Sequence, residues 1–384
     1  MRVRSGAASN FLCRYLPLFL VLAFVWLQGI LRGQTAGELG LKTGKQIYEA
    51  TCAGCHGQGG KGQPVSTLGF EPPSTFPDFS DCSSSSREPD SHWFAMIHEG
   101  GGNRGFSPIM PAFSPALTRD EISKVIEHVR SFCADPKWPR GNLNLPRALY
   151  TEKAFPEDEV VLTSAFNLNH EPAVNQTLVI EKRLGARTNF EAIIPGAFQK
   201  QPSGSWFGGV GDISLELKRT LFHSLRKGAI LALAGEARLP TGNVSRGLGS
   251  GVTYLETFLA YDQILPRNVF VQTQAGVETP THRHQEPTEV FWRTAVGKSL
   301  NQSRGLGRTW SPMIEAVSAR EMIPGAQTEW DIVPQMQVTL NKRQHIRANF
   351  GVSIPARNTA GRAAQLVFYL LWDFFDGGIR DGWK

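Results

Sequence analysis

The residues of this 384-residue chain with the most specific chemistry are Cys52, Cys55 and His56, which form a C-x-x-C-H motif. Two thiols at this spacing can form thioether bonds to the vinyl groups of a haem, and the next histidine then lies beside the iron as a ligand. A thioredoxin-like redox pair and half of a zinc site also use C-x-x-C. Neither explains the adjacent histidine, and the chain has no second C-x-x-C for zinc. We therefore expect one covalently bound haem c.

A six-coordinate iron needs a second axial ligand, and four side chains are candidates: Met110, Met96, His92 and His98. Met110 stands between Pro108 and Pro111, which prevent a helix and hold an extended loop from which a thioether can project. The other three fall in 90–99, where apolar spacing predicts a short helix that faces the haem or solvent. We favour Met110, so the expected metal ligands are His56 and Met110.

Histidine and methionine together fill both axial positions of the iron and leave no open site for a substrate. Electron transfer is then favoured over oxygen or peroxide chemistry, whereas a haem peroxidase would need an open position. The sequence contains no nucleophile elbow, no phosphate-binding glycine loop and no carboxylate pair spaced for acid-base work. We predict no catalytic residue and no enzyme activity.

Two further helices should position these ligands. Thr43 is the expected N-cap of a helix that leads into the cysteine motif. Thr118 and Glu121 have the spacing of a capping box, and the apolar residues that follow at helical spacing predict a final helix over about 118–133.

This order of helix, C-x-x-C-H, proline-bounded methionine loop and last helix resembles a small class I cytochrome c over about residues 40–135. The resemblance implies an all-α domain of three to five helices with His56 and Met110 on the iron.

The first 36 residues have the pattern of a signal peptide. A basic start precedes an apolar run over 15–31 and a small or polar stretch over 33–37. We expect cleavage near 33–36, with an uncleaved membrane anchor as the alternative because no A-x-A site is present. Four of the positive charges behind the formal net charge of +6 lie in this leader, and no basic face remains for nucleic acid.

Export places Cys82 and Cys133 in an oxidising compartment, where an even pair is expected to form a disulfide. Two separate free thiols are the alternative.

From residue 158 onward the sequence alternates apolar and polar residues in long runs separated by turn residues. About twelve runs begin near 158, 174, 188, 211, 228, 252, 267, 287, 309, 329, 344 and 364. Each is about long enough to cross a bilayer at a tilt, so we predict an all-β antiparallel up-and-down barrel over 158–384. A soluble β-sandwich or lipocalin-like barrel is the alternative. The segment 136–157 is predicted as a linker, with the acidic cluster Glu157–Glu159 on a solvated surface.

Three glycine-rich stretches, 209–213, 239–242 and 247–251, make residues 155–384 similar to outer-membrane barrels of the putative meta-pathway phenol-degradation and transporter-like family. The ending Trp383-Lys384 departs from the terminal aromatic residue usual in such barrels. The resemblance implies an outer-membrane barrel that holds the haem domain at the periplasmic face.

The predicted function is electron transfer with periplasmic redox proteins by a single haem anchored in outer-membrane lipid. The alternative is a channel for small solutes with a redox-sensing haem domain. The sequence leaves the oligomeric state open.

Overall fold

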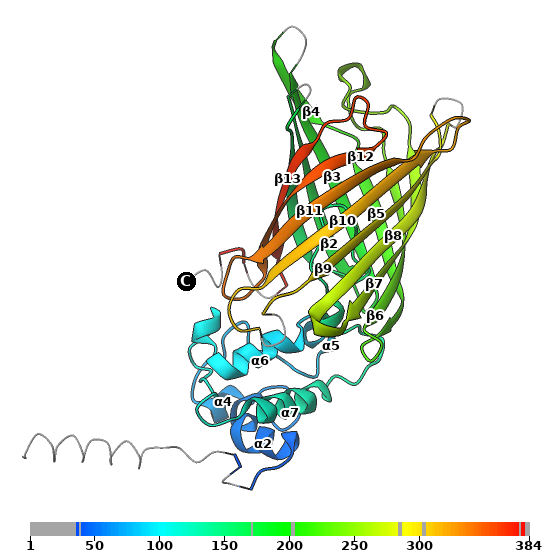
Figure 1. Ribbon diagram of the computed structural model, residues 1–384. Coiled ribbons are helices and arrows are strands. Elements are labelled where there is room, and N and C mark those ends of the chain that lie inside the picture. Colours follow the sequence, from blue (N-terminus) through cyan, green and yellow to red (C-terminus); the bar gives the residue numbers. More distant parts are fainter. Residues whose placement is uncertain are drawn as a thin grey trace, which may run out of the picture.

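The computed structural model describes residues 36–37, 40–169, 172–200, 204–282, 286–301, 305–375 and 378–380. It contains a helical domain followed by a β-barrel (Figure 1). Nearly all of the predicted leader, and the C-terminal Trp383 and Lys384, lie outside the described residues. None of the helices in the described part of the chain is both long and apolar enough to span a membrane.

The helical domain has the elements that the capping patterns predict. Thr43 and Thr118 each accept a hydrogen bond from the backbone N–H three residues on, and the side chains of Gln46 and Glu121 complete two capping boxes. The helices and 3₁₀ turns up to the barrel are α2 Gly44–Thr51, α3 Ala53–His56, α4 Val65–Leu68, α5 Cys82–Ser85, α6 Asp90–Glu99, η1 Gly102–Arg104, α7 Arg119–Arg130 and η2 Gly141–Leu143.

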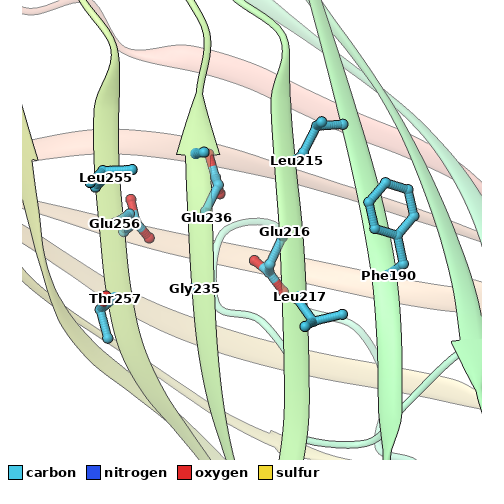
Figure 2. Close-up of a pocket in the computed structure, with 10 residues that line it drawn as sticks. Phe190, Leu215, Glu216, Leu217, Gly235, Glu236, Leu255, Glu256 and Thr257 are labelled. Atoms are coloured by element: carbon cyan, nitrogen blue, oxygen red, sulfur yellow. The ribbon is translucent and has the colours of Figure 1, made fainter.

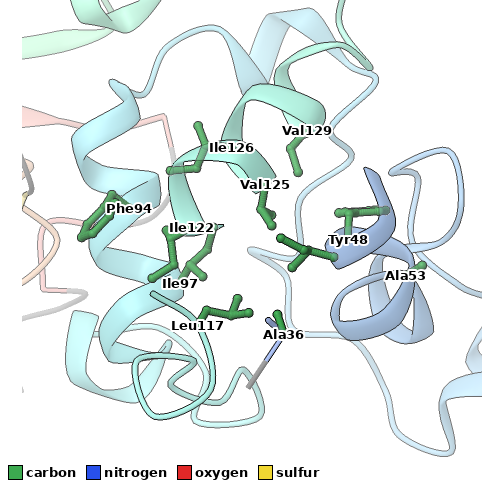
Figure 3. Close-up of a cluster of buried hydrophobic side chains, with 11 residues drawn as sticks. Ala36, Tyr48, Ala53, Phe94, Ile97, Leu117, Ile122, Val125, Ile126 and Val129 are labelled. Carbon is green, nitrogen blue, oxygen red and sulfur yellow. The ribbon is translucent and has the colours of Figure 1, made fainter. Parts of the chain in front are cut away.

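The core of this domain forms where α2 and α7 cross and α6 packs beside them (Figure 3). Tyr48 and Ile122 are fully buried there. Gly44 permits the close crossing, because a Cβ at this position would overlap the carbonyl oxygen of Lys124. A disulfide joins Cys82 to Cys133 with their Cα atoms 5.2 Å apart, and so ties α5 to the end of α7.

The second domain is a closed antiparallel barrel. Its strands are β1 Glu159–Asn167, β2 Ala173–Leu184, β3 Thr188–Lys200, β4 Trp206–Val210, β5 Ser214–Ser224, β6 Ala229–Arg238, β7 Tyr254–Leu265, β8 Val269–Pro280, β9 Glu289–Lys298, β10 Trp310–Glu321, β11 Glu329–Thr339, β12 Ile346–Arg357 and β13 Gln365–Asp373. Short β4 and β5 pair with successive parts of β3 and share one position in the wall. Pairing of β1 with β13 closes the sheet, so within the described residues the barrel has twelve strand positions, which confirms the predicted fold.

The barrel has apolar side chains outside and polar side chains inside. Along β5, Leu215 and Leu217 are exposed whereas Glu216 and Lys218 are buried. Exposed leucine, phenylalanine, tryptophan and isoleucine side chains continue this pattern around the wall. A soluble sandwich or lipocalin-like barrel buries its apolar face, while a membrane-spanning barrel turns that face to lipid. The surface is therefore that of a membrane barrel.

The helical domain lies at the barrel end with mostly short turns (Figure 1). Tight turns at 185–187, 225–228 and 266–268 close this end, whereas longer loops such as 239–253 occupy the other. In outer-membrane barrels the short turns face the periplasm. This polarity agrees with a periplasmic position for the helical domain.

Residues 143–155, here called the plug, lie inside the barrel rather than along its surface. Leu143 and Phe155 pack against Ala232 and Phe258 of the inner wall. On the neighbouring wall, Leu145 and Ala148 belong to a cluster with inward-facing side chains of β8, β9 and β10, and on the opposite wall Leu149 packs against β1, β2 and β13. The segment predicted as a linker thus fills part of the lumen.

Hydrogen bonds from the wall satisfy the backbone of the plug. The N–H of Leu149 donates to Gln335 at 3.0 Å, and the N–H of Ala154 donates to Asp262 at 2.9 Å. The N–H and hydroxyl of Thr151 both donate to Glu315, the hydroxyl at 2.6 Å. These bonds to β7, β10 and β11 hold the plug in place. They are needed because the irregular plug has no helix or sheet pattern in which its own N–H groups could be paired.

The prediction that Glu157–Glu159 lies on a solvated surface is wrong. All three side chains are buried, and each has a cationic partner. Lys153 pairs with Glu157, Arg87 pairs with Asp158 at 2.7 Å, and Arg147 pairs with Glu159 at 2.6 Å. The cations come from the plug and the helical domain, which composition alone did not place beside the acids.

Candidate haem site

The C-x-x-C-H motif forms a tight turn between two short helices. Cys52 ends α2, and α3 carries Cys55 and His56 before Gly57 turns the chain at φ 75°. Three hydrogen bonds fix this turn: Tyr48 Oη to Gly57 O at 2.8 Å, Gly62 N to His56 O at 2.8 Å, and Gln63 N to Cys55 O at 3.0 Å. The two thiols and the imidazole are therefore presented by one short, well-held segment.

The surroundings of His56 suit an imidazole that binds a metal. Its ring stacks on Phe76 and contacts Phe79, with both ring centroids 4.9 Å away. Burial lowers the pKa of His56 to about 4, so the ring is neutral at physiological pH. Its buried Nδ1 has no hydrogen-bond partner. Cys52 and Cys55 are free thiols, not joined to each other, and so both are available for thioether bonds. These residues fit a c-type haem.

Met110 lies on an irregular loop that returns to the end of α6. Gly101 N donates to Met110 O at 3.0 Å, and Phe113 N donates to Ile97 O at 2.9 Å. Met110 itself packs against the buried core that includes Tyr48 and Ala53. The loop is thus anchored on both sides of the methionine.

Two glycines make this anchoring possible. A Cβ on Gly100 would lie 2.7 Å from Ala112 N, and a Cβ on Gly101 would overlap the carbonyl oxygen of Ser107. At both positions backbone approaches backbone so closely that only glycine fits.

The competing histidines occupy other surroundings. His92 Nδ1 lies 2.5 Å from one oxygen of Glu88, whose other oxygen lies 2.5 Å from Nε2 of His345 in the β11–β12 turn. His92 therefore contributes to the junction with the barrel. His98 stacks on Phe94, which Figure 3 shows well away from Tyr48 and Ala53 beside the motif.

The helical residues match a known family. Residues 40–129 match the model of the family described as cytochrome c oxidase, cbb3-type, subunit III. The helical domain is a cytochrome c domain. A domain of this family implies a haem, and the matched stretch includes both the C-x-x-C-H motif and the Met110 loop. The match covers less than half of the chain and does not extend into the barrel.

Solved structures resemble the barrel at low identity. They include the NanC porin, with 7% identity and a TM-score of 0.40, covering 56% of this chain and 98% of that one. The KdgM porin with disordered oligogalacturonate has 9% identity and a TM-score of 0.36, covering 56% and 99%. An outer membrane channel from Pseudomonas putida F1 has 15% identity and a TM-score of 0.36, covering 59% and 99%. No curated protein matches the chain.

The cytochrome domain is docked on the barrel by specific contacts. Arg343 of the β11–β12 turn donates to Gly105 O at 2.9 and 3.0 Å and lies over the ring of Phe106. Gly305 approaches α6 so closely that a Cβ would overlap the carbonyl oxygen of Ser91. The cytochrome domain is therefore held in a fixed position on the end of the barrel.

We predict that Gly101→Ala displaces the Met110 loop. The added methyl group must push Ser107 away, at a cost of about 1–3 kcal/mol for overpacking. The variant should unfold at a lower temperature and lose intensity in the methionine-to-iron charge-transfer band of the oxidised protein.

Gly59→Ala is the matched control, because a Cβ on Gly59 meets no atom within 4 Å. Equal spectra and equal melting temperatures for the two variants would contradict the proposed role of Gly101.

Proposed function

We propose that this protein is an electron carrier whose cytochrome domain is held at the periplasmic face of the outer membrane by the barrel. In this proposal Cys52 and Cys55 carry one haem through thioether bonds, and His56 and Met110 are its axial ligands. The bound haem would supply reversible one-electron transfer between ferric and ferrous iron. The domain family and the lipid-compatible outer surface of the barrel support the proposal.

The single observation that carries the proposal is the environment of His56. A partly buried imidazole whose Nδ1 is buried and unpaired directly follows two free thiols in a turn that is otherwise well hydrogen-bonded. An unpaired polar group in a buried site is costly unless a ligand uses the ring. The anchored Met110 loop supplies a second ligand and favours a carrier over a haem enzyme.

The plug supports an anchoring role for the barrel over that of an open pore. It fills part of the lumen, packs against β6 and β7 on one side and β1 and β13 on the other, and is hydrogen-bonded to several strands. A single haem at one end cannot carry electrons across a hydrocarbon core about 30 Å thick. Exchange would therefore be local, with periplasmic redox proteins as partners.

A second candidate function is a gated channel for cationic solutes, and a row of glutamates on the inner wall favours it. Eight glutamates lie directly opposite one another on successive strands from β2 to β10: Glu181, Glu191, Glu216, Glu236, Glu256, Glu278, Glu289 and Glu321. Figure 2 shows three of them in line on β5, β6 and β7. The row starts near the plug and reaches the far rim, so it would favour cations if the plug moved.

The Met110→Ala variant distinguishes an electron carrier from a haem enzyme. The wild-type protein should show the methionine-to-iron band when oxidised and bind no CO when reduced. The variant should lose the band, bind CO stoichiometrically and have a lower reduction potential, because a thioether ligand raises the potential. Rapid CO binding by the wild-type protein would instead support an open iron site.

Arg147→Met tests whether the plug closes the lumen. Arg147 pairs with Glu159 and Glu181, and its loss leaves the buried Glu181 without its cation and Glu159 with only Lys153 at 3.4 Å; removing one partner of a buried ion pair typically costs about 3–5 kcal/mol. In planar bilayers the variant should carry at least a severalfold larger current than the wild type, with preference for cations.

Arg246→Met, at an exposed loop position, is the control and should leave the current unchanged. If the current through Arg147→Met equals that of the wild type, the plug does not close the barrel.

A further inference from the structure

A cavity of about 790 Å³ lies where the cytochrome domain, the segment after α7 and the barrel meet. Its lining comes from the end of α5, from Trp93 on α6, from the end of α7, from 133–140 and from the β5–β6 turn at 223–226. This volume lies within the range of sites that hold small organic molecules. The cavity does not include Cys52, Cys55, His56 or Met110, so it is distinct from the candidate haem site.

The walls of the cavity combine flat apolar surfaces with positive charge. Trp93 and Trp138 supply two indole rings, and a guanidinium lies over each: Arg130 at 3.7 Å and Arg183 at 4.9 Å from the ring centroids. Arg130 is neutralised by Asp90 at 2.7 Å. Arg140 and Arg226 also line the cavity, and no carboxylate of the described residues pairs with either of them. One acid, Asp135, contributes to the lining.

Several polar groups of the lining are buried without partners. The hydroxyls of Ser85 and Ser86 accept and donate no hydrogen bond, although these residues are only 7% and 4% exposed. Nε2 of His223, on the barrel side, is also buried and unpaired. Unsatisfied buried polar groups are uncommon in folded proteins, so three of them in one lining mark a junction where the hydrogen bonding of the protein is incomplete.

We propose that this junction cavity binds a small planar organic anion. Its flat apolar body would lie between Trp93 and Trp138, and its carboxylate would face Arg140 and Arg226. Because the barrel turn supplies part of the wall, only the docked full-length chain forms the complete site.

The junction cavity is also connected to the candidate haem site by aromatic contacts. Trp93 lies 5.5 Å from Phe79, and Phe79 lies 4.9 Å from His56, measured between ring centroids. A ligand against Trp93 is thus two ring contacts away from the imidazole.

Isothermal titration of the detergent-solubilised full-length holoprotein with benzoate tests the proposal. Benzoate should bind at one site per chain, and benzamide, which has the same shape without the charge, at least about tenfold more weakly. Arg140→Gln should weaken benzoate about tenfold or more, as expected for loss of one charge-assisted hydrogen bond. Arg246→Gln, at an exposed loop position away from this lining, should not change the affinity.

Arg226→Gln provides a second test at an exposed turn position, should the first variant fail to fold. It should weaken benzoate binding and leave benzamide binding as it is. Absence of saturable benzoate binding, or equal affinities for wild type and both cavity variants, would overturn the proposal. Trp138→Leu should weaken benzoate and benzamide alike, since it removes a shared apolar wall.

Discussion

The structure depends on the pairing of charges inside the barrel. A wall that turns its apolar face outward must point polar and acidic residues into the lumen, where each unpaired charge is costly. Arg147 and Lys153 of the plug meet Glu159, Glu181 and Glu157 there. Lys218 of β5 lies 3.2 Å from Glu152 of the plug and 3.6 Å from Glu216. Charges of the plug and of the wall therefore pair with one another.

This pairing also determines where the cytochrome domain sits. The plug is continuous with the end of the helical domain, and Arg87 of that domain reaches Asp158 beside the first strand. The β11–β12 turn adds Arg343 and His345 from the barrel side. With both ends of the connection fixed, the domain is held at one end of the barrel, and the junction cavity exists as a consequence of that docking.

Features set by neighbours in sequence could be predicted, and features set by distant segments could not. The capping boxes at Thr43 and Thr118, the helix over 90–99 and twelve alternating strands follow from local spacing, and the structure contains them. The plug could not be predicted, because its backbone partners, such as Gln335 and Glu315, lie more than 150 residues away. The same reason explains the error at Glu157–Glu159. Strand register likewise brings the eight glutamates into one row, although their separate positions are visible in the sequence.

The central claim is that one covalently bound haem is carried by a barrel in the outer membrane. It is tested most directly by separating inner and outer membranes, denaturing the proteins, staining for haem, and measuring the pyridine haemochrome of the purified chain. The account predicts one haem per full-length chain, stable to denaturation and confined to the outer-membrane fraction, and no haem on a Cys52→Ala/Cys55→Ala variant. A wild-type chain without haem in a host that matures cytochromes c, or a haem-bearing chain in the inner membrane or soluble fraction, would contradict it.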